Sequence, residues 1–129
     1  AEELKGKRIL VAEDNALNAE IILTILKDYG IEAELAADGD IVIDMLKRNQ
    51  ADYYDMILMD IQMPHMDGYE ATKVIRRLED RRAEIPIVAM TANAFEEDRK
   101  AAFAAGMNGH VAKPIEISRL LETMAELLN

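Results

Sequence analysis

The chain has no cysteine and no tryptophan, and only 5% of its 129 residues are aromatic. The lack of cysteine excludes disulfide bonds and thiolate metal sites. Because aromatic side chains are so few, aliphatic residues and methionine must build the core. No apolar stretch approaches the roughly 20 residues that a membrane span needs, and residues 1–5 do not resemble a signal peptide. We therefore expect a cytoplasmic domain that makes no membrane contact.

Positive charge is also scarce, and the formal net charge is −10. Proteins that bind nucleic acid normally carry a basic surface, so direct binding of nucleic acid is not expected. The one basic cluster, Arg76–Arg77 with Arg81–Arg82, is interleaved with acidic residues, and we interpret it as a solvated helix end and loop. The length suits a single domain over residues 1–129, with residues 1–5 as a linker remnant.

Strand and helix signals alternate five times along the chain. Short apolar runs are typical of buried parallel strands, and a run with period two is typical of a more exposed strand. The expected strands are 8–12, 31–35, 56–59, 87–90 and 111–112, and helical patterns follow each of them, the first over 17–29. Because parallel strands need right-handed crossovers, the pattern predicts a (βα)5 doubly wound α/β fold of the flavodoxin-like type. Its five-stranded parallel sheet should have the order 2-1-3-4-5.

Three acidic residues follow two of these expected strands. Glu13 and Asp14 come after the first strand and Asp60 after the third, and the predicted order makes these strands neighbours at a switch point where ligands bind. Close carboxylates repel one another unless a cation lies among them, and oxygen ligands favour Mg²⁺, with Mn²⁺ as an alternative. We expect Asp14 and Asp60 to bind the ion directly, Glu13 to bind it through water, and a backbone carbonyl near Gln62 to complete the protein ligands. Taken alone, Glu13–Asn15 could instead be a turn and a helix cap.

Two further strands end in polar residues, Thr91 and Lys113. Taken alone, each could be an ordinary strand-end or surface residue. Together with the acidic residues they complete a pattern that resembles the receiver domain of two-component response regulators, over essentially the whole chain. In finer detail the chain is similar to the receivers of hybrid histidine kinases. The matching segments are Val11–Asn15, Leu58–Pro64 with Met66–Gly68, Ile87–Ala92 and Gly109–Pro114.

The resemblance implies a role for each site residue. Asp60 would be the phosphoacceptor, receiving a phosphoryl group from a histidine of a partner. That partner would be a histidine kinase dimerisation domain or a histidine phosphotransfer domain. Glu13 and Asp14 would hold Mg²⁺, Thr91 would donate its hydroxyl to a phosphoryl oxygen, and Lys113 would pair with another. Such a domain catalyses its own phosphorylation and dephosphorylation as part of a phosphorelay.

The resemblance also implies a conformational switch. In the family, the hydroxyl residue, here Thr91, moves toward the phosphoryl group while an aromatic residue of the fifth strand turns inward. His110 stands at that second position, where tyrosine or phenylalanine is commoner, so a histidine with no switching role is the alternative. A cis peptide bond is expected before Pro114. Gln62 and Asn93 flank the expected phosphoryl site and should tune the lifetime of the phosphoryl group.

The helix expected over 17–29 carries more apolar residues than one buried face requires. We expect Leu17, Asn18 and Ile21 to contact the histidine-bearing partner, since an exposed apolar strip suits a partner helix. The alternative is that both faces of this helix are covered within the domain.

Two other functions remain open at this stage. A receiver-like interaction module that is never phosphorylated usually lacks one of the key residues, and here all are present. An Mg²⁺-dependent phosphohydrolase with an aspartyl nucleophile, like the haloacid dehalogenase-type enzymes, has a second Asp two residues after the nucleophile. This chain has Gln62 at that position.

Overall fold

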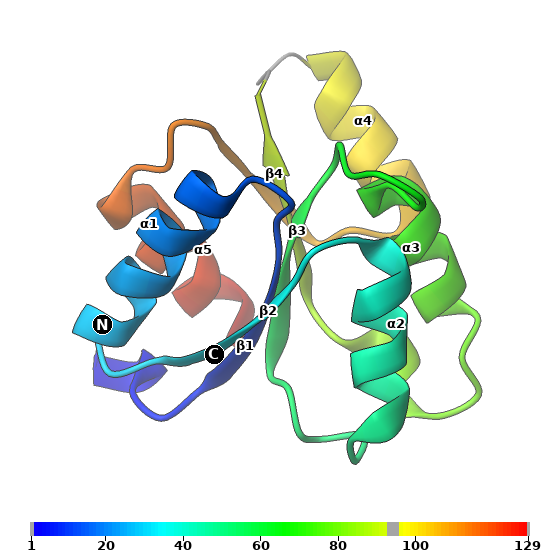
Figure 1. Ribbon diagram of the computed structural model, residues 1–129, viewed down its shortest axis with the longest axis horizontal. Helices are drawn as coiled ribbons and strands as arrows, with labels where there is room; N and C mark the ends of the chain where they lie inside the picture. Colours follow the sequence, from blue (N-terminus) through cyan, green and yellow to red (C-terminus); the bar gives the residue numbers. More distant parts are fainter. Residues whose placement is uncertain (1, 93–95, 129) are drawn as a thin grey trace.

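A computed structural model describes residues 2–92 and 96–128 of the chain. Five parallel strands form one sheet with helices on both faces. Figure 1 shows α1 and α5 on one face and α2, α3 and α4 on the other. The strands are β1 (Arg8–Ala12), β2 (Glu32–Ala36), β3 (Met56–Asp60), β4 (Ile87–Thr91) and β5 (Gly109–Ala112). The helices are α1 (Ala16–Asp28), α2 (Gly39–Arg48), α3 (Gly68–Arg76), α4 (Glu96–Ala105) and α5 (Ile117–Leu128), with short 3₁₀ helices η1 (Glu2–Leu4) and η2 (Arg81–Glu84).

The strand order is β2-β1-β3-β4-β5, and every neighbouring pair is parallel. The predicted flavodoxin-like α/β fold and its strand order are thus confirmed. The chain leaves β1 toward one edge of the sheet and returns to β3 on the other side of β1. The connections therefore diverge at the carboxyl ends of these two central strands, which opens a crevice there.

Two apolar layers hold the sheet between its helices, because successive residues of a strand point to opposite faces. Leu10 and Ile57 pack with the α2 and α3 side. Ile9 and Leu58 pack with the α1 and α5 side. β3 and β4 are buried along their whole length, whereas β2 is an edge strand with exposed positions, as predicted. The site residues that follow β1, β3 and β4 thus stand on a rigid base.

Short polar and glycine residues set the ends of the helices. The side chain of Asn15 accepts a hydrogen bond from Asn18 N at 3.0 Å and caps α1, and Asp67 caps α3 in the same way. Gly30 follows α1 with a φ of 75°. Ile31 N donates to Leu26 O at 3.0 Å, so Ile31 closes the helix end and β2 begins one residue later than predicted.

The prediction of a solvated basic cluster is wrong for two of its four arginines. Arg76 donates to the carbonyl oxygens of Gly106, Ala83 and Ile85, each at 2.8 Å. Arg82 donates to Leu46 O at 2.8 Å, and the loop that carries it forms η2. Both guanidinium groups therefore join neighbouring segments by satisfying carbonyl groups at helix and loop ends.

The start of the chain is packed against the domain. Leu4 is fully buried in the apolar layer on the α1 and α5 side. Residues 2–4 therefore belong to the folded body, and the linker origin of residues 1–5 stays a prediction. Among the described residues, no helix has both the length and the apolar character needed to cross a membrane.

Candidate functional site

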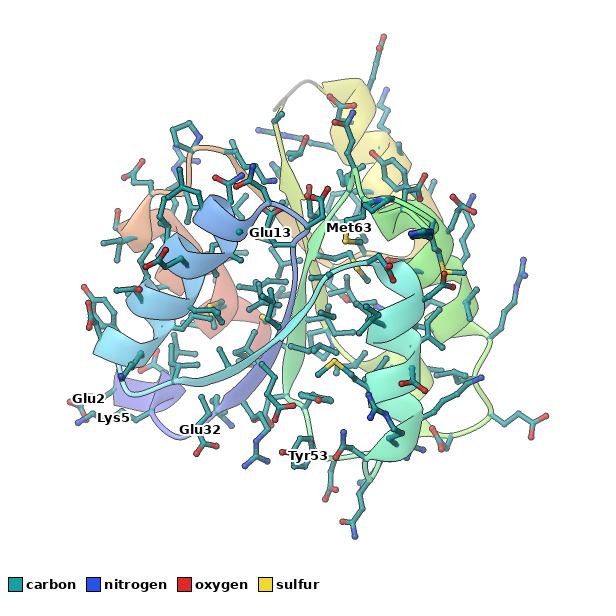
Figure 2. The ribbon with its side chains drawn as sticks, in the orientation of Figure 1. Glu2, Lys5, Glu13, Glu32, Tyr53 and Met63 are labelled. Atoms are coloured by element: carbon teal, nitrogen blue, oxygen red, sulfur yellow. The ribbon has the colours of Figure 1, made fainter. Side chains whose placement is uncertain are left out.

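A pocket of about 850 Å³ opens at the carboxyl end of the sheet. Figure 2 shows Glu13 and Met63, which line it, at this end, with Tyr53 at the opposite end. All five residues to which the sequence assigns the chemistry take part in its lining. These are Glu13, Asp14, Asp60, Thr91 and Lys113.

The acidic residues meet as the strand order predicts. One carboxylate oxygen from each of Glu13, Asp14 and Asp60 lies within 4.8 Å of the other two. Glu13 and Asp60 are buried, with 1% and 6% exposed area, and Asp14 is exposed. Three oxygen donors this close lie within reach of a single cation, and oxygen donors are what Mg²⁺ prefers. The residues present therefore fit a magnesium ion.

Lys113 lies between the two buried carboxylates. Its Nζ is 2.8 Å from Glu13 Oε1 and 3.1 Å from Asp60 Oδ1. Glu13 Oε2 accepts a hydrogen bond from Asn15 N at 3.3 Å. The backbone N–H of Lys113 donates to Thr91 O at 2.8 Å, which ties the ends of β4 and β5 together. The peptide bond between Lys113 and Pro114 is cis, as expected.

These contacts shift the pKa values of Asp60, Glu13 and Lys113 in different directions. Burial, followed by the nearby Glu13, raises the pKa of Asp60 to about 7 against the opposing effect of Lys113. Burial also acts to raise the pKa of Glu13, but hydrogen bonds with Asp60 and Lys113 outweigh it, so that pKa is lowered. Burial acts to lower the pKa of Lys113, but pairing with both carboxylates outweighs it, so that pKa is raised. Ionised Asp60 is therefore the costly species, and an added cation would lower its pKa.

One face of α1 beside the pocket is apolar and exposed. Leu17 and Ile21 are 66% and 46% exposed, and Asn18 is half-buried. A second pocket of about 490 Å³ lies next to this face, and Glu13 and Lys113 are among the residues that line it. Its apolar lining residues are Ile21, Ile22, Ala92, Pro114 and Ile115. The expected exposed strip is present, and its role in docking stays a prediction.

Comparison with known proteins gives the family. The family of response regulator receiver domains matches residues 9–125. The chain belongs to this family. Curated relatives include the osmosensing histidine protein kinase SLN1 of Saccharomyces cerevisiae, 43% identical over 122 residues that cover 92% of this chain. The hybrid signal transduction histidine kinase I of Dictyostelium discoideum is 40% identical over 121 residues, also 92% of the chain. The receiver domain spans only 10% and 7% of these two relatives.

Solved structures agree with this assignment. The receiver domain of a sensor histidine kinase from Pseudomonas aeruginosa, with a magnesium ion coordinated in its active-site cleft, is 38% identical. Its TM-score is 0.85, with coverage of 95% of this chain and 98% of that one. Another solved structure contains the histidine phosphotransfer protein Ypd1 of Saccharomyces cerevisiae with the receiver domain of its response regulator Ssk1. It matches this chain with 28% sequence identity and a TM-score of 0.85. That match covers 97% of this chain and 90% of that one. The chain is thus a phosphorelay signalling domain of the kind found in hybrid histidine kinases.

Gly68, which belongs to the matching segment Met66–Gly68, also has a steric role that was not predicted from the sequence. Gly68 begins α3, and its N–H donates to Ile61 O at 2.9 Å. A Cβ atom added to Gly68 would clash with the carbonyl oxygen of Asp60, so any side chain there must push the end of β3 away. No local pattern signals this role, because the close contact joins the start of α3 to the end of β3.

Asp98 lines the pocket and was not predicted from the sequence. It lies on α4, and its neighbours one and two turns on, Ala102 and Ala105, are buried. The spacing of the three residues puts them on one face of the helix. Helical periodicity could therefore have placed Asp98 on the inner side of α4, toward the pocket.

The two expected switch residues occupy different environments. Thr91 is 7% exposed at the end of β4 and lines the pocket. His110 is half-buried in β5 opposite Ala89 and is not among the residues that line the pocket. Burial, and then the charges of Arg99 and Arg119, lower the pKa of His110, which favours a neutral imidazole. Whether His110 changes position on phosphorylation stays a prediction.

The residues expected to tune the phosphoryl lifetime are described only in part. Gln62 is exposed and lines the pocket two residues after Asp60. The ligand role of its backbone carbonyl stays a prediction. Asn93 lies outside the described residues.

Proposed function

We propose that the domain takes a phosphoryl group from a partner phosphohistidine onto Asp60. The observation that carries this proposal is the pairing of Asp60 with Lys113 at 3.1 Å inside the acidic cluster at the end of β3. The magnesium-bound receiver from Pseudomonas aeruginosa supports Mg²⁺ as the cofactor. The structure with Ypd1 supports a histidine phosphotransfer domain as one kind of partner, and the hybrid kinase relatives support a kinase dimerisation domain as the other.

The proposed ligand set is Glu13, Asp14 and Asp60 with the backbone carbonyl of Gln62. When bound, Mg²⁺ would neutralise charge on the phosphoryl oxygens. Glu13 Oε1 supports this assignment, since it is buried and already has a positive charge beside it, the Lys113 ammonium at 2.8 Å. A buried carboxylate oxygen in that position is suited to a cation or to water bound to it.

In the proposed step, a carboxylate oxygen of Asp60 attacks phosphorus. The new O–P bond forms as the P–N bond to the partner imidazole breaks, and the imidazole leaves with that electron pair. Phosphoryl transfer depends mainly on positioning and on neutralising the charge of the equatorial oxygens. Lys113 supplies an ammonium and Thr91 a hydroxyl from fixed strand ends, so neither group needs to reorganise during the reaction.

Incubation with Mg²⁺ and acetyl phosphate tests this function. The expected result is a mass increase of one phosphoryl group in the wild type and none in Asp60→Asn. Rapid turnover of external phosphate esters would favour the phosphohydrolase. No adduct at all would favour the interaction module. Phosphotransfer profiling against histidine kinases and histidine phosphotransfer domains would then identify the partner. The cytoplasmic location of the domain stays a prediction.

The partner surface is part of the same proposal. Exposed Leu17 and Ile21, with Asn18 at the pocket edge, fit a partner that presents its histidine from the α1 side. Leu17→Asn with Ile21→Asn should slow transfer from the phosphohistidine of a partner, while the Mg²⁺ affinity and the reaction with acetyl phosphate stay unchanged.

A matched control is Ile41→Asn on α2, because Ile41 is also exposed (38%) but lies in the other helix layer. It should leave transfer from the partner at the wild-type rate. If the α1 double variant also transfers at the wild-type rate, the docking assignment is wrong.

A further inference from the structure

The pocket carries more negative charge than the proposed chemistry requires. Five carboxylates line it, and the one cation among its described lining residues is Lys113. Three of the carboxylates, those of Glu13, Asp14 and Asp60, form the acidic cluster. With Lys113 and one divalent cation, that cluster is formally neutral. The remaining two, Asp67 and Asp98, therefore account for the net negative charge of the loaded pocket.

These two aspartates line the pocket on the side where Tyr69 lies, although one precedes α3 and the other belongs to α4. Asp67 caps the start of α3, and Asp98 lies in the first turn of α4. Both act on Tyr69, whose pKa is raised by burial and then by the charges of Asp98 and Asp67. Tyr69 lines the pocket as well. We call Asp67 and Asp98 the acidic rim.

The opposite side of the site has a different character. There the second pocket reaches Glu13 and Lys113 between apolar walls, with exposed Ile21 at its edge. A donor that approaches from α1 meets no carboxylate other than Glu13 among the described residues that line this second pocket. A small donor that enters from the α3 and α4 side must pass the acidic rim.

We propose that the acidic rim is a specificity device that slows small anionic phosphodonors while sparing a phosphohistidine presented by a partner on α1. The proposal rests on the function proposed above. Fixed charge at a pocket mouth changes the local concentration of charged reactants and their rate of entry. For a dianion and a unit charge roughly 10 Å apart in water, removal of the unit charge gives an about threefold to fourfold faster reaction at low ionic strength.

Acetyl phosphate is the probe, since it is a small dianion. In its reaction a carboxylate oxygen of Asp60 attacks phosphorus, the bond from phosphorus to the acetyl oxygen breaks, and acetate leaves with the electron pair. Phosphoramidate serves as a second probe, because its ammonium group offsets one of its negative charges. A purely electrostatic rim should therefore affect phosphoramidate less than acetyl phosphate.

The test compares Asp98→Asn with Glu97→Gln. Glu97 is exposed, belongs to the same turn of α4 and does not line the pocket, so the control removes the same charge from the same helix end. We expect Asp98→Asn to react about threefold to fourfold faster with acetyl phosphate at low salt, and less than twofold faster with phosphoramidate. Added salt near 1 M should remove the difference, because charges then interact over only about 3 Å.

Two further measurements separate this proposal from a structural effect. Asp67→Asn should repeat the acceleration, since asparagine caps a helix about as well as aspartate does. Transfer from a phosphorylated histidine phosphotransfer protein should stay within twofold of the wild type in both variants. The proposal is overturned if Asp98→Asn matches Glu97→Gln with acetyl phosphate, or if the acceleration persists in high salt. A wild type that forms no adduct with any donor refutes instead the function on which the proposal rests.

Discussion

Replacing the buried aspartate at the end of β3 should stabilise the metal-free domain. Asp60 is 6% exposed, and burial and then Glu13 raise its pKa to about 7 despite the opposing effect of Lys113. In the unfolded chain the pKa of an aspartate is about 3.9, so the folded state holds this proton more tightly. Ionisation of Asp60 therefore disfavours folding, and Asp60→Asn removes that cost.

The size of the effect follows from linkage. A gap of about three pKa units corresponds to about 4 kcal/mol, and the pocket is open to water, which screens part of it. We expect Asp60→Asn to raise the free energy of unfolding by about 1–3 kcal/mol above pH 7. The advantage should shrink as the pH falls from about 7 to about 4, because Asp60 in the wild type is then protonated in the folded state and increasingly in the unfolded state as well.

Urea unfolding in a chelator at pH 8 and at pH 4.5 measures the difference. Glu122→Gln is the control, because this exposed residue of α5 carries the same charge, and it should change stability by less than about 0.5 kcal/mol. Added Mg²⁺ should stabilise the wild type more than Asp60→Asn. An Asp60→Asn variant no more stable than the wild type at pH 8 in chelator would refute the electrostatic reasoning.

Three further predictions concern other parts of the domain. His65 has a φ of 67° in a tight turn where Met66 N donates to Pro64 O at 2.7 Å. His65→Gly should therefore raise the free energy of unfolding by up to about 1 kcal/mol. A lower free energy of unfolding, measured with urea, would contradict this. Arg76→Met leaves three carbonyl groups without their donor and should lower the free energy of unfolding by about 2–3 kcal/mol. The control Arg77→Met changes an exposed arginine and should lower it by less than about 0.5 kcal/mol. Structures with and without a phosphoryl mimic should show His110 in different positions, and identical positions would exclude it as a switch.

Much of the fold and of the site could be predicted because the signals are local and repeated. Buried strands appear as apolar runs, and an edge strand such as β2 appears as an alternating run. Once the strand order is known, residues at the carboxyl ends of neighbouring strands must lie close together. The predicted strand order therefore placed Asp14 near Asp60. The boundary at Ile31 was missed because its N–H completes the end of α1, a contact that an alternating pattern does not reveal.

Contacts between side chains and backbone groups could not be predicted from the sequence. Arg76 and Arg82 bind carbonyl oxygens, and every residue type offers a carbonyl, so no pattern marks the acceptors. Nor does the sequence reveal how near Glu13 stands to Lys113. The sequence suggested that Glu13 binds a cation through water and that Lys113 pairs with a phosphoryl group. In the structure these two side chains pair with each other at 2.8 Å.

The pairing of Glu13 with Lys113 affects whether Asp60 is ionised and therefore able to react. In the proposed transfer, Asp60 must be ionised to attack phosphorus. Its raised pKa makes ionisation incomplete near pH 7, while Glu13 holds the nearer contact with Lys113. A cation among the three carboxylates would lower the pKa of Asp60 and would leave Lys113 freer to pair with an arriving phosphoryl oxygen. The buried strands β1 and β3 keep these charges close despite the cost, because moving them apart would disrupt the apolar layers on both faces of the sheet. An ion bound among the three carboxylates would therefore restore part of the stability given up at this end of the sheet, and it would prepare Asp60 for the phosphoryl transfer proposed for the domain.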